Sequence, residues 1–258
     1  MKREVVEKIQ FNGLYQLSSE SLCSSCVAAT VKTSMYMVIE MIGKGSFGRV
    51  YHVKEKISGE GQIMIISQLC FFRYDANVLF TGKDFAMKVM EKEEVLKTSE
   101  PRHLAEERRI LASINFPFTV SYESHFQTRS ELCLVMEYVE GSDLYQLLTS
   151  EGTFDLEAVR FYLSEILLSL EYLHHLGLIY RDLKLENILV DKTGHVKIVD
   201  LGFTRVLGKG EKCRTFCGTV HYLAPEILQG KKYNKAVDWW AFGILAYEVS
   251  LLSIEIPP

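Results

Sequence analysis

The sequence lacks a surplus of basic residues. Its 29 Lys and Arg are outnumbered by 33 Asp and Glu, so the formal net charge is −4. A domain that binds nucleic acid through its surface charge is typically basic. The composition therefore argues against nucleic acid as a partner, and a partner attracted by the overall charge is expected to be basic.

Long hydrophobic runs and a targeting signal are also missing. The longest apolar stretch, residues 62–72, is too short to cross a bilayer as a helix. The charged start MKREVVEKIQ leads into no apolar segment of the signal-peptide kind, and Lys2 stands where an N-myristoylation motif has glycine. We expect no membrane span and a cytoplasmic or nuclear location.

The cysteines are scattered and offer no zinc site. Of the six, only Cys23 and Cys26 form a C-x-x-C pair, whereas a structural zinc ion needs four ligands. This usage favours free thiols in a reducing compartment. The remaining composition, 48% hydrophobic and 24% charged, is typical of a globular protein with an ordinary core.

The hydrophobic pattern changes its period along the chain. After an N-terminal extension, residues 1–36, β-branched and aromatic runs predict strands at YMVIEMIG, RVYHV, DFAMKVM and LCLVMEYV. From Asp155, a candidate N-cap, apolar residues recur at three- and four-residue spacing, and Gly177 is a candidate helix stop. Strands followed by helices predict an α+β fold with two lobes, residues 37–139 and 140–258.

A glycine-rich segment lies between the first two predicted strands. Gly43, Gly45, Gly48 and Val50 form the pattern G-x-G-x-x-G-x-V, in which glycines let the backbone approach phosphate oxygens. A plain glycine hairpin would show the same pattern. A dinucleotide-binding oxidoreductase is disfavoured, because there a helix follows the glycines and here a strand does.

A lysine interrupts the apolar strand Phe85-Ala-Met-Lys88. A buried ammonium needs a partner, and Glu107 in the predicted helical segment AEERRIL can supply it. Lys88 would then hold the phosphates of ATP. The alternative is a lysine at a strand end whose ammonium reaches solvent.

The segment from Tyr180 to Asn187, YRDLKLEN, carries the strongest pattern. Phosphoryl transfer depends mainly on positioning and charge stabilisation. Asp182 would orient the attacking hydroxyl and accept its proton, and Lys184 would neutralise charge on the transferred group. Asn187 and Asp200, the latter in Asp-Leu-Gly, would ligate Mg²⁺, which prefers oxygen.

These motifs, with APE at 224–226 and VDWW at 237–240, resemble the protein-kinase signature set over about residues 37–250. YRDLK, FPF at 116–118 and YNKAVDWWA at 233–241 are similar to the cyclic-AMP-dependent kinases of the AGC group. The resemblance implies the bilobal kinase fold, a catalytic loop braced by Asp238, and a cyclic-AMP-binding regulatory subunit as a partner. It also implies further ATP-binding positions, namely Ile42, Ser46, Phe47, Ala86, Met136, Glu137 and Val139.

The resemblance further implies transfer to Ser or Thr in basic protein segments. Thr219 matches the threonine that marks Ser/Thr kinases, and Lys184 agrees with it. The positions that read substrate arginines are all acidic, and carboxylates pair bidentately with arginine. These positions are Asp143, Glu186 and Glu248, and an apolar pocket for the residue after the target would comprise Phe216, Val220 and Leu223.

An activation-loop phosphosite is implied at Thr215. A phosphate there needs cations. His103, Arg181 and Arg205 fall at the family's phosphate-binding positions. Phosphorylated Thr215 is expected to dock on these three residues and to order the loop.

The sequence departs from the family in the first lobe, where residues 60–82 have no counterpart. Gly59-Glu60 can be coded with a splice donor, and Phe80-Thr81-Gly82 with an acceptor. The segment is therefore either a retained intron or a real insertion, and as an apolar hairpin loop it would favour aggregation.

Further departures concern the second lobe. Leu201 replaces the usual Phe of DFG, and Val220-His221 replaces Pro-Glu. The chain stops at Pro258, before the family's last helices, so we expect Trp239, Phe242, Leu245 and Val249 to lose part of their cover, and Glu226 to lose an arginine partner. Two functions follow from the sequence: an active kinase, or an impaired fragment that acts as a binding protein.

Overall fold

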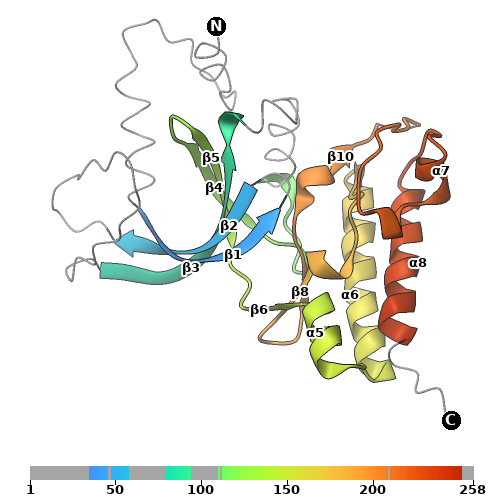
Figure 1. Cartoon of the computed structure of the whole chain (residues 1–258), viewed down its shortest axis with the longest axis horizontal. Coiled ribbons are helices and arrows are strands. Elements are labelled where there is room, and N and C mark those ends of the chain that lie inside the picture. The colour runs from blue at the N-terminus through green and yellow to red at the C-terminus, as the bar shows by residue number, and fades with distance from the viewer. Residues whose placement is uncertain are drawn as a thin grey trace, which may run out of the picture. The chain divides into compact units, whose positions relative to one another are not determined.

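The computed structural model describes residues 35–45, 48–57, 79–93, 110, 112–208 and 210–251. The chain divides into two compact units: residues 1–105 with 122–138, and residues 106–121 with 139–258. The first is built on a β-sheet and the second mainly on helices (Figure 1), so the predicted α+β class is confirmed. Among the described residues, no helix is both long and apolar enough to cross a membrane.

A five-stranded antiparallel sheet forms the first unit. Its strands are β1 (Tyr36–Gly45), β2 (Gly48–Ile57), β3 (Leu79–Glu91), β4 (Tyr122–Gln127) and β5 (Glu131–Glu137), in the spatial order β1-β2-β3-β5-β4. Because side chains alternate between the two faces of a strand, Phe85 and Met87 of β3 share one buried face. They pack there with Val53, Phe126 and the β5 residues Cys133 and Val135.

The last residues of the inserted segment belong to a strand in the structure. Strand β3 begins at Leu79, so residues 79–82 continue the strand that carries Lys88. Phe80 pairs with Lys56 and Leu79 with Ile57, beyond an irregularity in the register. Pairing with β2 satisfies backbone groups that a loop would leave to solvent. The sequence alone does not show that residues 79–82 pair in this way. Residues 60–78 lie outside the described residues.

Helices dominate the second unit. They are α5 (Leu144–Glu151), α6 (Leu156–His175), α7 (Pro225–Leu228) and α8 (Ala236–Leu251). A small sheet of β6 (Gly141–Asp143), β8 (Ile188–Asp191) and β9 (Val196–Ile198) accompanies them, and β7 (Leu178–Ile179) pairs with β10 (Arg205–Val206). Single turns of 3-10 helix, η1 (Leu185–Asn187), η2 (Leu201–Phe203) and η3 (Val220–Tyr222), lie in the connections.

Helix α6 starts as predicted. The carboxylate of Asp155 accepts a hydrogen bond from the backbone N–H of Ala158 at 2.7 Å, which is the N-cap geometry. The helix ends at His175, and Gly177 follows with a φ of 72°, a conformation that favours glycine. Its buried residues Ile166, Leu170 and Leu173 form part of the core of this unit, and α6 packs against α8.

Helix α8 is better covered than the sequence suggested. Leu245 and Val249 are completely buried, so the predicted loss of cover at these two residues is wrong. Trp239 is 37% exposed, as expected, and Trp240 and Tyr247 are also exposed. The residues that face the core of the second unit are thus already covered, and the exposed apolar surface lies on the other sides of the helix.

Candidate active site

The loop 180–187, between β7 and β8, is anchored by a buried carboxylate. Asp238, in the first turn of α8, accepts hydrogen bonds from the backbone N–H groups of Tyr180 (2.9 Å) and Arg181 (2.8 Å). It also bonds Nε2 of His174 at 2.7 Å, and it is only 1% exposed. Arg181 has a φ of 71°, in the left-handed region that non-glycine residues seldom adopt. These bonds therefore hold an unfavourable backbone turn that fixes the direction of the next residue, Asp182.

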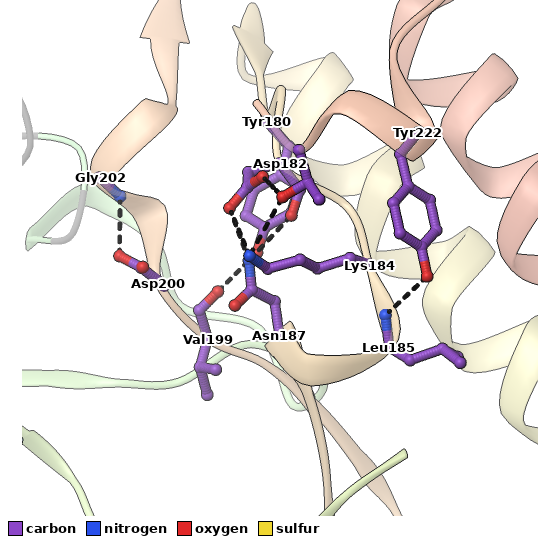
Figure 2. A network of polar contacts seen from close by, with 10 residues as sticks. Tyr180, Asp182, Lys184, Leu185, Asn187, Val199, Asp200, Gly202 and Tyr222 are labelled. Carbon is purple, nitrogen blue, oxygen red and sulfur yellow. Dashed lines mark hydrogen bonds and ion pairs between the residues drawn. The ribbon is translucent and has the colours of Figure 1, made fainter. Parts of the chain in front are cut away.

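The three other predicted catalytic side chains meet at the Asp182 carboxylate. Thr219 Oγ1 donates to Asp182 Oδ1 at 2.9 Å, and Lys184 Nζ donates to Thr219 Oγ1 at 3.1 Å. Asn187 Nδ2 donates to Asp182 Oδ2 at 3.0 Å, and Lys184 Nζ lies 3.5 Å from the same oxygen. Figure 2 shows this convergence of the Asp182, Lys184 and Asn187 side chains. A carboxylate, an ammonium and a hydroxyl are thus held together on one loop and the segment that crosses it.

Burial changes the acidity of this carboxylate. It raises the pKa of Asp182 above the ordinary value of an aspartic acid, and the Lys184 charge and the hydrogen bonds from Thr219 and Asn187 oppose the shift. The nearby negative charge of Asp200 adds to the increase. A carboxylate with a raised pKa is a better proton acceptor than an exposed one, which suits a general base.

Asn187 and Asp200 offer oxygen ligands for a cation. Asn187 Nδ2 donates to the backbone oxygen of Asp182 at 2.9 Å as well as to its carboxylate, so the amide oxygen points away from these bonds. Asp200 is exposed, has a left-handed φ of 53°, and accepts from the N–H of Gly202 at 3.3 Å. An amide oxygen and a carboxylate fit Mg²⁺, which takes few protein ligands and completes its shell with water and phosphate oxygens.

The buried hydroxyl of Tyr180 ties the loop to the segment that carries Asp200. It donates to the backbone oxygen of Val199 at 2.6 Å (Figure 2), and Tyr180 is fully buried. Burial raises its pKa well above that of an ordinary tyrosine. The hydroxyl thus stays protonated and keeps this bond.

The predicted phosphate-binding residues of the first unit are described in part. Lys88 is 8% exposed on the central strand β3, opposite Val50 of β2 and Leu134 of β5. Gly48 has a φ of 144°, and a Cβ there would lie 2.2 Å from the backbone oxygen of Val89, so only glycine fits. The predicted partner of Lys88, Glu107, lies outside the described residues. So do the glycine-loop residues Ser46 and Phe47.

The remaining predicted ATP-binding positions lie on four strands and the following segment. Ile42, Gly43 and Gly45 are on β1 and Val50 on β2, whereas Ala86 on β3 pairs with Met136 on β5. Glu137 ends β5, and Val139, 9% exposed, belongs to the second unit. Their contact with a nucleotide stays a prediction.

Around Thr215, the structure links the predicted phosphosite to Arg181 through a tyrosine. The Tyr233 hydroxyl donates to the backbone oxygen of Thr215 at 2.7 Å and accepts from Nη1 of Arg181 at 3.3 Å. The side chain of Thr215 is exposed, as is Arg205 on β10. His103 lies outside the described residues.

The predicted substrate-binding residues differ in their surroundings. Asp143 caps α5, accepting from the N–H of Gln146 at 2.8 Å, and Glu186 is exposed on η1. Glu248 accepts a hydrogen bond from the Tyr222 hydroxyl. Of the three residues of the predicted apolar pocket, Leu223 is 6% exposed and packs in a core cluster, whereas Phe216 and Val220 are each 63% exposed. Their contact with a substrate stays a prediction.

Sequence reasoning missed three residues of this site. His174, Tyr222 and Tyr233 act through long-range hydrogen bonds to Asp238, Glu248 and Arg181 respectively. His174 and Tyr222 contact residues that lie far away in the sequence, and no short motif marks such a pair. Tyr233 was identified in the sequence only as the first residue of the family motif YNKAVDWWA.

A small antiparallel sheet, a helical unit and a loop that gathers Asp182, Lys184 and Asn187 together define a phosphotransferase class of domain. The chain belongs to the protein kinase family, since the protein kinase domain matches residues 74–255, more than half of its length. The family assignment agrees with the resemblance that the sequence motifs carry.

Known relatives narrow the class. The RAC serine/threonine-protein kinase of Drosophila melanogaster is 39% identical over 228 residues, 88% of this chain and 34% of that protein. The RAC-beta serine/threonine-protein kinase of Rattus norvegicus is 38% identical over 235 residues, 90% of this chain and 44% of that protein. Serine/threonine-protein kinase gad8 of Schizosaccharomyces pombe is 39% identical over 215 residues, 83% of this chain and 34% of that protein.

The chain thus spans less than half the length of these curated relatives. They are serine/threonine kinases and agree with the predicted AGC group. None of the three is by name a cyclic-AMP-dependent kinase, so they give the narrower resemblance no specific support.

Proposed function

We propose that the protein transfers the γ-phosphoryl group of ATP to Ser or Thr in protein substrates. The arrangement around Asp182 carries this proposal: its carboxylate is buried and held by Thr219, with Lys184 3.5 Å away. Asp182 accepts the proton of the attacking hydroxyl, and the raised pKa favours that step. Lys184 stabilises negative charge on the transferred group.

ATP and Mg²⁺ are the cofactors of this proposal. Lys88, the glycines of β1 and β2, and the backbone near Glu137 would hold the nucleotide. Asn187 and Asp200 would hold Mg²⁺, which neutralises phosphate charge when it is bound. Their oxygen atoms are the donor type that this ion prefers.

For the substrate, we propose Ser or Thr preceded by arginines, as in cyclic-AMP-dependent kinases. Glu186 supports this because its carboxylate is exposed, next to the buried Leu185 and Asn187 of the loop 180–187. Glu248 is held by the Tyr222 hydroxyl, which fixes its position. A cyclic-AMP-binding regulatory subunit and a cytoplasmic or nuclear location complete the proposal.

The proposal predicts that saturating Mg·ATP raises the thermal midpoint of the purified chain. At about 100 times Kd, a ligand that binds only the folded state adds ~2.7 kcal/mol. Asp200→Ala should abolish the shift, and Glu140→Ala, which removes an exposed carboxylate paired with Lys192 at 3.1 Å, should keep it. A shifted melt together with phosphorylation of an Arg-Arg-x-Ser peptide supports the kinase. A shift without any transfer would favour a nucleotide-binding protein without turnover, and no shift would contradict both.

Phosphorylation of Thr215 is proposed to activate the enzyme. The phosphate would be drawn to Arg181, which already reaches Thr215 through Tyr233, and to Arg205. Thr215→Ala should lower activity at least about tenfold, which corresponds to roughly 1.4 kcal/mol, less than one strong charge-assisted hydrogen bond. Thr149→Ala, at an exposed threonine on α5, is the control. Undiminished activity of the Thr215 variant in the peptide assay would refute the switch.

A further inference from the structure

One face of the five-stranded sheet carries a histidine among the predicted nucleotide-binding residues. Cross-strand partners share a face, and His52 of β2 pairs with Ala86 of β3, which in turn pairs with Met136 of β5. Val50, two residues before His52, lies on the same face because side chains alternate along a strand. The side chain of His52 is only 14% exposed. It therefore belongs to the face that carries these three predicted ATP-binding positions.

A carboxylate of the neighbouring strand β3 holds the ring of His52. Oδ1 of Asp84 lies 2.8 Å from Nε2 of the ring, and because an ionised carboxylate only accepts hydrogen bonds, Nε2 donates. Asp84 is also 3.7 Å from the ammonium of Lys54, and Glu40 of β1 lies 3.9 Å from Nδ1 of the ring. The histidine is thus fixed between β1 and β3, the two neighbours of its own strand.

The ring of His52 also stacks on the ring of Tyr138. The two centroids are 3.9 Å apart and the planes are within 4° of parallel. Tyr138 directly follows Glu137, the last residue of β5. Since β3 lies between β2 and β5 in the sheet, the stack is a side-chain bridge across β3. It fixes the end of β5 to β2 in addition to the backbone ladder that joins β5 to β3.

This bridge lies where the proposed function places the nucleoside part of ATP. Lys88, which would hold the phosphates, pairs with Leu134, and Glu137 lies three residues farther along β5, about 10 Å away. Phosphates held at Lys88 leave the nucleoside for the backbone at Glu137. A backbone that is held in its binding geometry before the ligand arrives loses less conformational freedom on binding, and so binds more tightly.

We propose that His52 is a positioning residue for the nucleoside of ATP. Held by Asp84, it fixes the backbone at Glu137 through its stack on Tyr138. The inference rests on the proposed function, because it concerns the same ATP site. A backbone that binds the nucleoside holds it equally in the ground state and in the transition state. Loss of the bridge therefore raises KM for ATP and leaves kcat unchanged.

The experiment titrates the full chain with adenosine and with Mg·ATP in a calorimeter. His52→Leu removes the ring but leaves Asp84 its contact with Lys54, and Tyr138→Leu removes the other half of the stack. Each variant should bind both ligands about tenfold more weakly, which corresponds to about 1.4 kcal/mol. KM for ATP should rise by the same factor, with kcat within about twofold of the wild type. The double variant should lose no more than either single variant, because the same contact is removed only once.

Glu123→Leu is the matched control. It makes a polar-to-leucine change at a half-exposed side chain of β4 that pairs with Lys83 at 3.5 Å, and it should bind both ligands like the wild type. Thermal melts establish that each variant is folded. His52→Gln, which keeps a donor for Asp84 but lacks the ring, replaces His52→Leu if that variant does not fold, and should show the same loss of affinity.

The two ligands separate failure of this inference from failure of the proposed function. Unchanged adenosine affinity in the His52 and Tyr138 variants would overturn the inference, whether or not their melting temperatures fall, and a lowered kcat at unchanged KM would do the same. Wild type that binds Mg·ATP but no adenosine would also overturn it, since the site would then recognise only phosphates. Wild type that binds neither ligand would overturn the proposed function as well.

Discussion

Asp182→Asn is expected to lower kcat by about 10²–10⁴-fold, the usual contribution of a general base. The amide keeps the size of the carboxylate but cannot accept the hydroxyl proton. In the proposed mechanism, other residues make most of the contacts to the substrate and to ATP, so KM should change little. The prediction depends on the proposed phosphoryl transfer, because the base acts only in that reaction.

The measurement is steady-state phosphorylation of an Arg-Arg-x-Ser peptide. Asp155→Asn is the matched control, since asparagine is as good an N-cap for α6 as aspartate and should leave activity unchanged. A kcat within twofold of wild type for Asp182→Asn would remove Asp182 from the mechanism. A rise in KM with unchanged kcat would assign Asp182 to substrate binding instead.

The same base predicts the pH dependence of the wild type. Protonation of Asp182 removes the proton acceptor, so kcat falls as the pH is lowered through its pKa. Because burial raises that pKa, the acidic limb should lie above about pH 3.9, the ordinary value for aspartic acid. Thr219→Val removes a hydrogen bond that lowers the pKa, so the limb should move to higher pH.

Most of the fold could be predicted from local pattern. The strand segments and the N-cap at Asp155 are local features, encoded by alternation and by one side chain. The start of β3 at Leu79 could not be predicted, because it depends on pairing with Lys56 and Ile57 in another strand. The burial of Leu245 likewise depends on packing in three dimensions, which an all-apolar helix sequence does not specify.

Part of the candidate site could likewise be predicted from local sequence, and part could not. Asp182, Lys184 and Asn187 lie within one short motif, so their proximity follows from the sequence. His174 and Tyr222 were missed because their partners are Asp238 and Glu248, on another helix.

Asp238→Ala should destabilise the second unit by about 3–5 kcal/mol. The substitution leaves the N–H groups of Tyr180 and Arg181 and Nε2 of His174 without their acceptor, and each unsatisfied buried donor costs about 1–3 kcal/mol. Relaxation of Arg181 from its left-handed conformation offsets part of that sum. Since domains have only about 5–15 kcal/mol to lose, the variant should unfold at much lower denaturant.

Urea unfolding at neutral pH measures this loss. Asp155→Ala, which removes an exposed N-cap, should cost only about 1 kcal/mol and calibrates an ordinary aspartate deletion. Asp238→Asn should fall between the two, because one oxygen still accepts while the amide N–H₂ opposes a donor. A loss for Asp238→Ala no larger than that for Asp155→Ala would mean that the loop 180–187 keeps its shape without the buried carboxylate. The phosphorylation activity of Asp238→Ala would then test whether the turn at Arg181 depends on Asp238.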